Sequence, residues 1–379
     1  MEFRYSEEHV ELRKGVRRLL AEVASESATR AAMGSELGWD RAAYQRLAGE
    51  LGVVGLAVPE SFGGSGGGLM ELGLVLQEAG RALLCAPLLA TVLAARALLE
   101  SGDDAACARL LPGLAAGTSV ASLAVLELGG WDAPVATTAS SDGSGWVVSG
   151  VKRWVLDAQS ADLLVVSAAA PPGLSLFVVD PGAGGVEVTP VAGVDPTRRQ
   201  ATVTLTSAPA VPLGGLGSGA AALSRTLDVA VVLLAAEQLG LAERCLEMAT
   251  AYAKERTQFD RAIGSFQAVK HKLANVLLEV EAATSAVMYA LWTADRDVAE
   301  LPLVACIAGS TCSETALLAA SENVQVHGGI GCTWEHPAHL YLKRATTDRQ
   351  LLGDPQRHLA RLADLVDALP PGHLVAVPR

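Results

Sequence analysis

The stretch Tyr252-Ala-Lys-Glu-Arg-Thr-Gln-Phe-Asp-Arg-Ala-Ile-Gly-Ser-Phe-Gln-Ala-Val-Lys-His271 decides how this chain is organised. It joins two long helical patterns, one from about residue 223 to 255 and the other from about 266 to 295. The residues between them, including Gln258 and Gly264, are poorly suited to continuing a helix. The sequence therefore predicts two helices that reverse direction around a compact loop.

The loop carries three groups that suit a phosphate-bearing cofactor with a flat ring. The guanidinium of Arg256 suits a diphosphate, because its planar set of donors matches phosphate oxygens. The amide of Gln258 and the aromatic face of Phe259 would orient such a ligand. The same residues also fit an ordinary helical hairpin that bears a solvated arginine, so the chemistry alone leaves both interpretations open.

Length and composition limit the class of protein. A chain of 379 residues that is 50% hydrophobic is expected to fold into two or three domains and to form an oligomer. Its net charge of −12 argues against a nucleic-acid partner. The longest apolar run, Val229 to Ala236, is too short to cross a membrane, and the polar N-terminus lacks a signal peptide. We therefore expect a cytoplasmic protein without a membrane span.

Six cysteines are scattered through the chain without a CxxC pair. They are expected to be reduced, buried small residues, and no metal site is expected.

Periodicity divides the chain into three regions and a tail. Residues 1–118 are expected to be helical, with patterns at 7–25, 39–51, 69–82, 87–101 and 104–111, the last ending before Pro112. Residues 119–213 change to a period of two and predict short strands at 146–155, 163–168, 174–179, 186–191 and 201–205. Strands spaced in this way favour a small antiparallel barrel or sandwich. Residues 220–368 are expected to be helical again, and 369–379 form a tail.

A glycine-rich segment, Phe62 to Gly68, lies within the first region. Such a loop can hold phosphate, but this one lacks both the GxGxxG spacing and the lysine of a P-loop. A flexible connector between helices is the preferred interpretation.

The opening stretch resembles the flavin-contacting helix-turn-helix of acyl-CoA dehydrogenases, which carries Arg-x-Gln-Phe-Gly followed by Ile-Gly-x-Phe-Gln. A second run, Gln325-Val-His-Gly-Gly-Ile-Gly331, resembles another C-terminal signature of that family. The order helical, β, helical also matches, so the resemblance covers residues 1 to about 368. It implies an α+β multidomain fold with a helical N-terminal domain, a small antiparallel β-barrel or sandwich, and a C-terminal four-helix bundle.

The resemblance implies FAD as cofactor. It assigns contacts with the FAD of a neighbouring subunit to Arg256, Gln258, Phe259, Phe266, Val269, Gln325, Gly328 and Gly329. The alternative for the His327-Gly-Gly segment is a plain turn between helices. In the middle region the residue matching the family is Trp154.

The middle region also departs from the family. Leu126 stands where a flavin-binding threonine is expected, and Leu156 replaces a second flavin-facing threonine. Each lost hydroxyl removes a hydrogen bond worth about 0.5–1.5 kcal/mol. Whether the middle region of this chain holds a flavin of its own therefore stays open.

Dehydrogenation of an acyl-CoA needs a carboxylate that removes the α-proton while the flavin takes the β-hydride. The two positions at which the family places this base hold Leu352 and Ala230. The nearest carboxylate is Asp228, our candidate catalytic residue, with Glu237 and Glu243 further along the chain. The alternative role of Asp228 is a charge near a helix N-terminus that favours the macrodipole.

Two hypotheses follow from these features. In the first, the chain is an FAD-dependent acyl-CoA dehydrogenase that forms homo-oligomers. In the second, it is a supporting subunit without a base, which completes the FAD site of a paralogous catalytic chain in an α2β2 complex, as in actinobacterial members that act on steroid side chains. A third, less favoured hypothesis is a flavin-free use of the fold. The resemblance further implies an acyl-CoA substrate and electron-transfer flavoprotein as electron acceptor.

Overall fold

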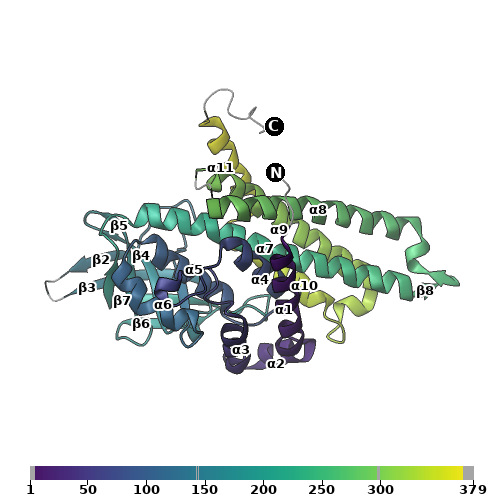
Figure 1. Cartoon of the computed structure of the whole chain (residues 1–379), viewed down its shortest axis with the longest axis horizontal. Helices are drawn as coiled ribbons and strands as arrows, with labels where there is room; N and C mark the ends of the chain where they lie inside the picture. Colours follow the sequence, from purple (N-terminus) through teal and green to yellow (C-terminus); the bar gives the residue numbers. More distant parts are fainter. Residues whose placement is uncertain (1–4, 142, 144, 297–298, 370–379) are drawn as a thin grey trace. The chain divides into compact units, whose positions relative to one another are not determined.

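The computed structural model describes residues 5–141, 143, 145–296 and 299–369. They form two compact units that divide between Ala230 and Val231. The first unit holds a helical region followed by a β region, and the second is helical (Figure 1). This order agrees with the three regions expected from periodicity.

The N-terminal region contains helices that begin at polar caps and pack through apolar faces. Asp40 and Asp103 cap two of them by accepting hydrogen bonds from Ala43 N and Ala106 N. The helix 26–34 was not anticipated, and the last helix continues through Pro112, because that residue lies in its final turn and removes only one N–H. The helices are α1 (Glu7–Val23), α2 (Glu26–Gly34), α3 (Arg41–Leu51), α4 (Leu69–Arg81), α5 (Leu88–Glu100) and α6 (Asp104–Ala115).

The glycine-rich segment 62–68 is a tightly bonded connector. Its backbone N–H groups donate to nearby carbonyls: Gly64 to Pro59, Ser65 to Gly55, Gly66 to Val58 and Gly67 to Leu56, at 2.8–3.2 Å. Donors used in this way cannot bind a phosphate, so the segment is a connector between helices and not a phosphate-binding loop. The segment is a fixed turn, however, and not the flexible linker that we expected from its composition.

Seven strands form the β region, two more than the five expected. They are β1 (Ala121–Ala124), β2 (Thr138–Ser141), β3 (Trp146–Leu156), β4 (Leu163–Ala170), β5 (Gly173–Val179), β6 (Val186–Pro190) and β7 (Gln200–Leu213). Hydrogen-bonded pairs run in a closed circuit from β4 through β2, β3, β7 and β5 back to β4. Because the missed strands are only four residues long, their alternation is too brief to detect.

Most strand pairs are antiparallel, as expected, but β1–β4 and β2–β4 are parallel. The prediction of an antiparallel barrel or sandwich is therefore wrong for these two pairs. Alternation of apolar residues reveals which face of a strand is buried, and it does not reveal the direction of the neighbouring strand. The apolar side chains of β3, β4, β5 and β7 form one buried cluster, and a second cluster joins β1 and β4 to α5 and α6.

The second unit is built around a central helix, α9 (Leu301–His327), which packs against α8 (Gln267–Arg296), α10 (Ala338–Asp348) and α11 (Pro355–Asp367). The long helix α7 (Gly219–Glu255) begins in the first unit and continues into the second. The predicted helices 223–255 and 266–295 are thus confirmed as α7 and α8. Short 3-10 turns, including η4 (Gly328–Cys332), connect the others.

Three helices are long and apolar enough to cross a membrane by length and composition, so the prediction that the chain has no membrane span is not confirmed. They are Gly219–Glu255, Gln267–Arg296 and the segment Leu301–Cys332. Searching for an uninterrupted apolar run missed them, because isolated polar residues such as Glu237 and Gln238 interrupt their alanine- and leucine-rich sequences. Within the most apolar 18-residue window, 72%, 39% and 67% respectively is buried inside the protein.

All six cysteines are free thiols, and five are buried as expected, whereas Cys332 is exposed. In the part of the chain that the structure describes, no group of three or more His, Cys, Asp or Glu residues could hold a metal ion. Except for Leu369, the expected tail 369–379 lies outside the described residues.

Candidate functional site

The loop between α7 and α8 is a tight β-hairpin. Strands β8 (Thr257–Gln258) and β9 (Arg261–Ala262) pair around two central residues, Phe259 and Asp260, which have φ of 53° and 57°. Such turns favour asparagine and glycine, because other side chains are strained at positive φ. Here the turn instead holds a phenylalanine whose ring is 86% exposed. Strain that presents an aromatic face to solvent is a feature of binding sites.

Arg256 is fixed through its backbone and free at its side chain. Its N–H donates to the carbonyl of Tyr252, and its carbonyl accepts from Ile263 N, both at 2.8 Å. Among the described residues its exposed guanidinium has neither an ion pair nor a hydrogen bond. The hairpin therefore holds an unpaired cation at a defined place.

Other predicted residues of this loop lie close together. Gln258 is exposed and donates to its neighbour Thr257 O at 3.0 Å. The half-buried Phe266 lies edge-on to Phe259, with ring centroids 6.1 Å apart, and the Arg261 guanidinium lies 4.0 Å above the Phe266 ring. Val269, half-buried, follows in the first turn of α8. Polar and aromatic side chains thus follow Arg256 closely along the hairpin and the start of α8.

The second signature forms the end of α9 and the turn after it. Gly328 has φ of 64° and its N–H donates back to Gln325 O and Val324 O, which ends the helix. Gly331 is packed so closely that a Cβ there would lie 2.9 Å from Val324 O, whereas a Cβ on Gly329 would meet nothing within 4 Å. Gln325 is exposed, and its amide has no partner among the described residues.

An aromatic stack joins the two signatures. The rings of Tyr252 and His327 are stacked with centroids 4.4 Å apart. The ring of His336 also packs against His327, with centroids 4.2 Å apart. His327 Nδ1 lies 2.8 Å from Asn323 O. Burial lowers the pKa of His327, and the hydrogen bond to Asn323 raises it less. The structure thus brings together the two motifs that the sequence placed about 70 residues apart.

These residues fit one side of a binding site for a phosphate-bearing cofactor with flat rings. A partnerless guanidinium would meet the diphosphate, an exposed aromatic ring would contact an apolar part of the ligand, and the open surface of Gly329 would permit close approach of the backbone. The chemistry of this donor set is compatible with FAD.

In the first unit, a buried ion pair fixes the loop that precedes β2. The ammonium of Lys152 is fully buried and lies 2.6 Å from Glu127 Oε1 and 3.1 Å from Ser167 Oγ. Glu127 also accepts hydrogen bonds from Ala136 N and from Thr137 N and Oγ1. Burial raises the pKa of Glu127, but the bonds from Lys152 and Thr137 outweigh it and lower that pKa to about 2.

For Lys152 the balance is reversed, because burial lowers its pKa more than Glu127 raises it. Each charge therefore offsets part of the cost of burying the other.

The loop fixed in this way presents apolar side chains. Leu128, next to Glu127, is 78% exposed, while Leu126 is half-buried and Leu156 is buried. Trp154 is half-exposed at φ of 49°, beside an irregularity in the β3–β7 register. The frame of the loop is thus intact, whereas the two positions expected to carry hydroxyls carry leucine.

The candidate bases and the matching base position have different surroundings. Asp228 is 2% exposed and lies nine residues after the start of α7, beyond the first turn in which a macrodipole acts, so its alternative role as a terminal helix charge does not apply. Glu237 is buried and paired with Arg344 at 2.7 Å. Leu352, where the resemblance predicts a base, is buried at φ of 60°.

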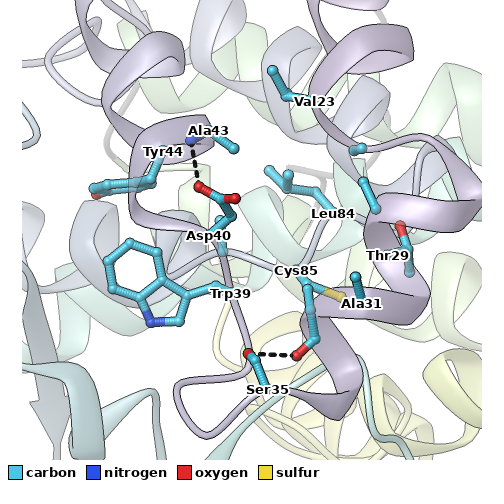
Figure 2. Close-up of a pocket in the computed structure, with 14 residues that line it drawn as sticks. Val23, Thr29, Ala31, Ser35, Trp39, Asp40, Ala43, Tyr44, Leu84 and Cys85 are labelled. Carbon is cyan, nitrogen blue, oxygen red and sulfur yellow. Dashed lines mark hydrogen bonds between the residues drawn. The ribbon is translucent and has the colours of Figure 1, made fainter.

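A pocket of about 270 Å³ lies in the N-terminal region, lined by α2, α3 and the connection between α4 and α5. Figure 2 shows Trp39, Asp40 and Tyr44 on one side of it and Leu84, Cys85 and Thr29 on the other. Asp40 caps α3, and Ser35 donates to Ala32 O, so these polar groups serve the fold. None of the predicted site residues lines this pocket.

Sequence reasoning missed Tyr252, His327 and His336 as contacting rings and Glu127 with Lys152 as a pair. The pair had no local signal, because its two residues lie 25 positions apart in the sequence. The stack had none, because its members come from three separate elements.

Three family models match the chain in order. They are the N-terminal domain of acyl-CoA dehydrogenase at residues 6–118, the middle domain at 116–207 and the C-terminal domain at 217–366. Acyl-CoA dehydrogenase IpdE2 of Mycobacterium tuberculosis is 38% identical over 357 residues, which cover 94% of this chain and 96% of the relative.

Solved structures are similar as well. The Tcur3481-Tcur3483 steroid ACAD G363A variant has a chain that is 36% identical, with a TM-score of 0.88 and coverage of 95% of this chain and 98% of that one. A chain of the ChsE4-ChsE5 complex from Mycobacterium tuberculosis is 30% identical, with a TM-score of 0.89 and coverage of 98% and 100%.

Proposed function

This chain belongs to the acyl-CoA dehydrogenase family, and on that premise we propose that it takes part in α,β-dehydrogenation of an acyl-CoA thioester as one subunit of a larger complex. The observation that carries the proposal is the partnerless guanidinium of Arg256 at the base of a strained hairpin, which the Tyr252–His327 stack links to the glycine turn of the second signature. An exposed guanidinium without a partner is suited to the diphosphate of FAD.

In this mechanism the chain binds and orients the cofactor. When bound, FAD supplies the acceptor for the β-hydride. Arg256 would hold the diphosphate, Gln258 and Gln325 would donate or accept hydrogen bonds at its edges, and Phe259 with Phe266 would cover apolar surface. Gly328 and Gly329 would allow the ligand to approach the backbone. Val269 would line the adenine side of the same binding site. Trp154 is proposed as the contact from the middle region.

The proton step needs a carboxylate, and two versions of the function differ in its source. In the self-sufficient version, Asp228 removes the α-proton. In the supporting-subunit version, a paralogous chain supplies both the base and an intact flavin loop, while this chain completes the site. Leucines at positions 126, 156 and 352 favour the second version, because the groups that a catalytic chain needs are the ones replaced. The similarity to chains of two-component complexes is in accord with it.

Further parts of the proposal follow from the family. We propose domains at 1–118, 119–213 and 220–368, with the middle one a small barrel and the last a four-helix bundle. Its long apolar helices would then be covered by their neighbours and by further subunits instead of lipid, in a cytoplasmic oligomer. An acyl-CoA would be the substrate, and electron-transfer flavoprotein would accept the electrons.

Expression of the chain alone and together with a base-bearing paralogue tests the proposal. We expect a colourless protein alone and a yellow complex that oxidises an acyl-CoA after co-expression. A chain that purifies yellow and turns over alone would exclude the supporting-subunit version. Absence of flavin in both preparations would overturn the proposed function.

A further inference from the structure

The two cofactor-binding motifs of this chain lie on different elements, so some contact must fix their relative position. The hairpin follows the end of α7, and the glycine turn follows the end of α9. Near the two signatures, the described residues provide two links. One is a surface ion pair, in which Lys272 lies 2.7 Å from Glu322. The other is the stack of Tyr252, His327 and His336.

The stack is the more rigid link, because its central ring is held on every side. His327 is 6% exposed and lies between two rings, with centroid distances of 4.4 Å to Tyr252 and 4.2 Å to His336. Its Nδ1 donates to Asn323 O at 2.8 Å, since a carbonyl oxygen can only accept. The hydrogen bond restricts rotation of the His327 ring, and the two neighbouring rings restrict its displacement.

The third ring is held by its own backbone. Ala338 N donates to His336 Nδ1 at 3.2 Å, so the proton of a neutral His336 lies on Nε2. His327 carries its proton on Nδ1. Backbone hydrogen bonds therefore orient both imidazole rings, whose centroids lie 4.2 Å apart.

Tyr252 and His327 each connect to one cofactor-binding group through a short stretch of backbone. The carbonyl of Tyr252 accepts the N–H of Arg256 at 2.8 Å, so the ring lies one helical turn before the guanidinium. On the other side, Gly328 directly follows His327, and a Cβ on Gly331 would lie 3.0 Å from the Cβ of His327. A displacement of either ring is therefore transmitted to Arg256 or to the glycine turn.

We propose that the Tyr252–His327–His336 stack positions the backbone of Arg256 relative to the glycine turn 328–331, so that the residue bearing the guanidinium and the turn are held in one geometry before the cofactor binds. Tyr252 and His327 are positioning residues in this inference and need not touch the ligand. It rests on the proposed function, since it assumes that Arg256 and the glycine turn face the same FAD. Pre-organisation of this kind increases affinity by removing an ordering cost from binding.

The test measures the FAD dissociation constant of the assembled apo-complex by flavin fluorescence. Aromatic pairs contribute an amount that corresponds to roughly a two- to tenfold change in binding. We expect Tyr252→Leu to weaken FAD binding about that much and Tyr252→Phe to restore wild-type affinity. The control Glu322→Gln removes only the surface link and should leave the dissociation constant unchanged.

A matched pair at the central ring separates stacking from hydrogen bonding. His327→Phe keeps a ring and loses the donor, whereas His327→Asn keeps a donor for Asn323 O and loses the ring. We expect the asparagine variant to bind FAD more weakly than the phenylalanine variant. The reverse order would overturn the stacking inference, as would equal affinities.

A double-mutant cycle shows whether Tyr252 acts through Arg256. Tyr252→Leu combined with Arg256→Ala should bind FAD about as weakly as Arg256→Ala alone, because there is no longer a guanidinium to position. Additive losses would overturn the inference. If Arg256→Ala weakens binding and Tyr252→Leu does not, only the inference fails. If neither weakens binding, the proposed function itself fails.

Discussion

The buried ammonium of Lys152 lies 2.6 Å from the carboxylate of Glu127, and this contact helps to fix the loop that precedes β2. Glu127 lies at the start of the loop and binds the backbone of Ala136 and Thr137 at its end. The frame is therefore complete, although Leu126 and Leu156 offer no hydroxyls. A loop can keep its shape after losing its ligand-binding groups.

Removing Lys152 should destabilise the protein. Lys152→Met leaves the carboxylate of Glu127 without its counter-ion in a half-buried site, which typically costs about 3 kcal/mol or more. The measurement is the urea midpoint followed by tryptophan fluorescence. Lys14→Met, which removes an exposed ion pair with Glu11, should produce no measurable shift. Equal midpoints for both variants would contradict this assignment.

The same pair should make stability depend on pH. The pKa of Glu127 falls from 4.5 to about 2 on folding. As the pH is lowered, Glu127 is therefore protonated at a higher pH in the unfolded chain than in the folded one. The stabilisation is complete above pH 4.5 and is lost as pH falls towards about 2. We expect the stability of Glu127→Gln to vary less with pH in this interval than that of the wild type. Parallel curves would show that Glu127 is not the group responsible.

Arg256 should contribute to flavin affinity without contributing to stability. Arg256→Ala removes charge-assisted hydrogen bonds worth about 1.5–3 kcal/mol, or roughly 10- to 150-fold in the FAD dissociation constant. Arg256→Lys keeps the charge and should recover part of the loss, because an ammonium lacks the planar pair of donors. Thermal unfolding of the apo-protein should be unchanged in both variants, since the guanidinium has no partner among the described residues.

Two glycines of the second signature should respond in opposite ways to substitution by alanine. A Cβ on Gly331 would press against Val324 O at 2.9 Å, so Gly331→Ala should lower stability by about 1–3 kcal/mol. A Cβ on Gly329 would meet nothing within 4 Å, so Gly329→Ala should fold normally and yet bind FAD more weakly. Unchanged affinity in Gly329→Ala would show that no ligand approaches this turn closely.

Replacing Asp228 distinguishes the two versions of the function. In the supporting-subunit version, Asp228→Asn should leave turnover of the complex largely unchanged, and we expect this result. If Asp228 is the base, turnover should fall at least about 100-fold, because a positioned base contributes roughly 10²–10⁴. Flavin content, measured in parallel by absorbance, shows whether a loss of turnover arises from the proton step or from cofactor loss.

Local sequence anticipated much of the secondary structure. The helices α7 and α8, on either side of the loop after Glu255, were predicted to within a few residues, because their apolar periodicity extends over many turns. The strands β1 and β2 and the helix α2 were missed, because short elements leave too little pattern. The exposure of Cys332 and the parallel pairing of β4 depend on neighbours far along the chain.

By itself, the sequence determined the family, the order of its three regions and the residue types available for cofactor and base. Those properties lie in local periodicity and in motifs read along the chain. Only the tertiary structure decided that Tyr252 stacks on His327, that Lys152 pairs with Glu127 and that Glu237 pairs with Arg344. These contacts join residues on separate elements, and packing alone sets which rings and charges meet, so no local pattern records them.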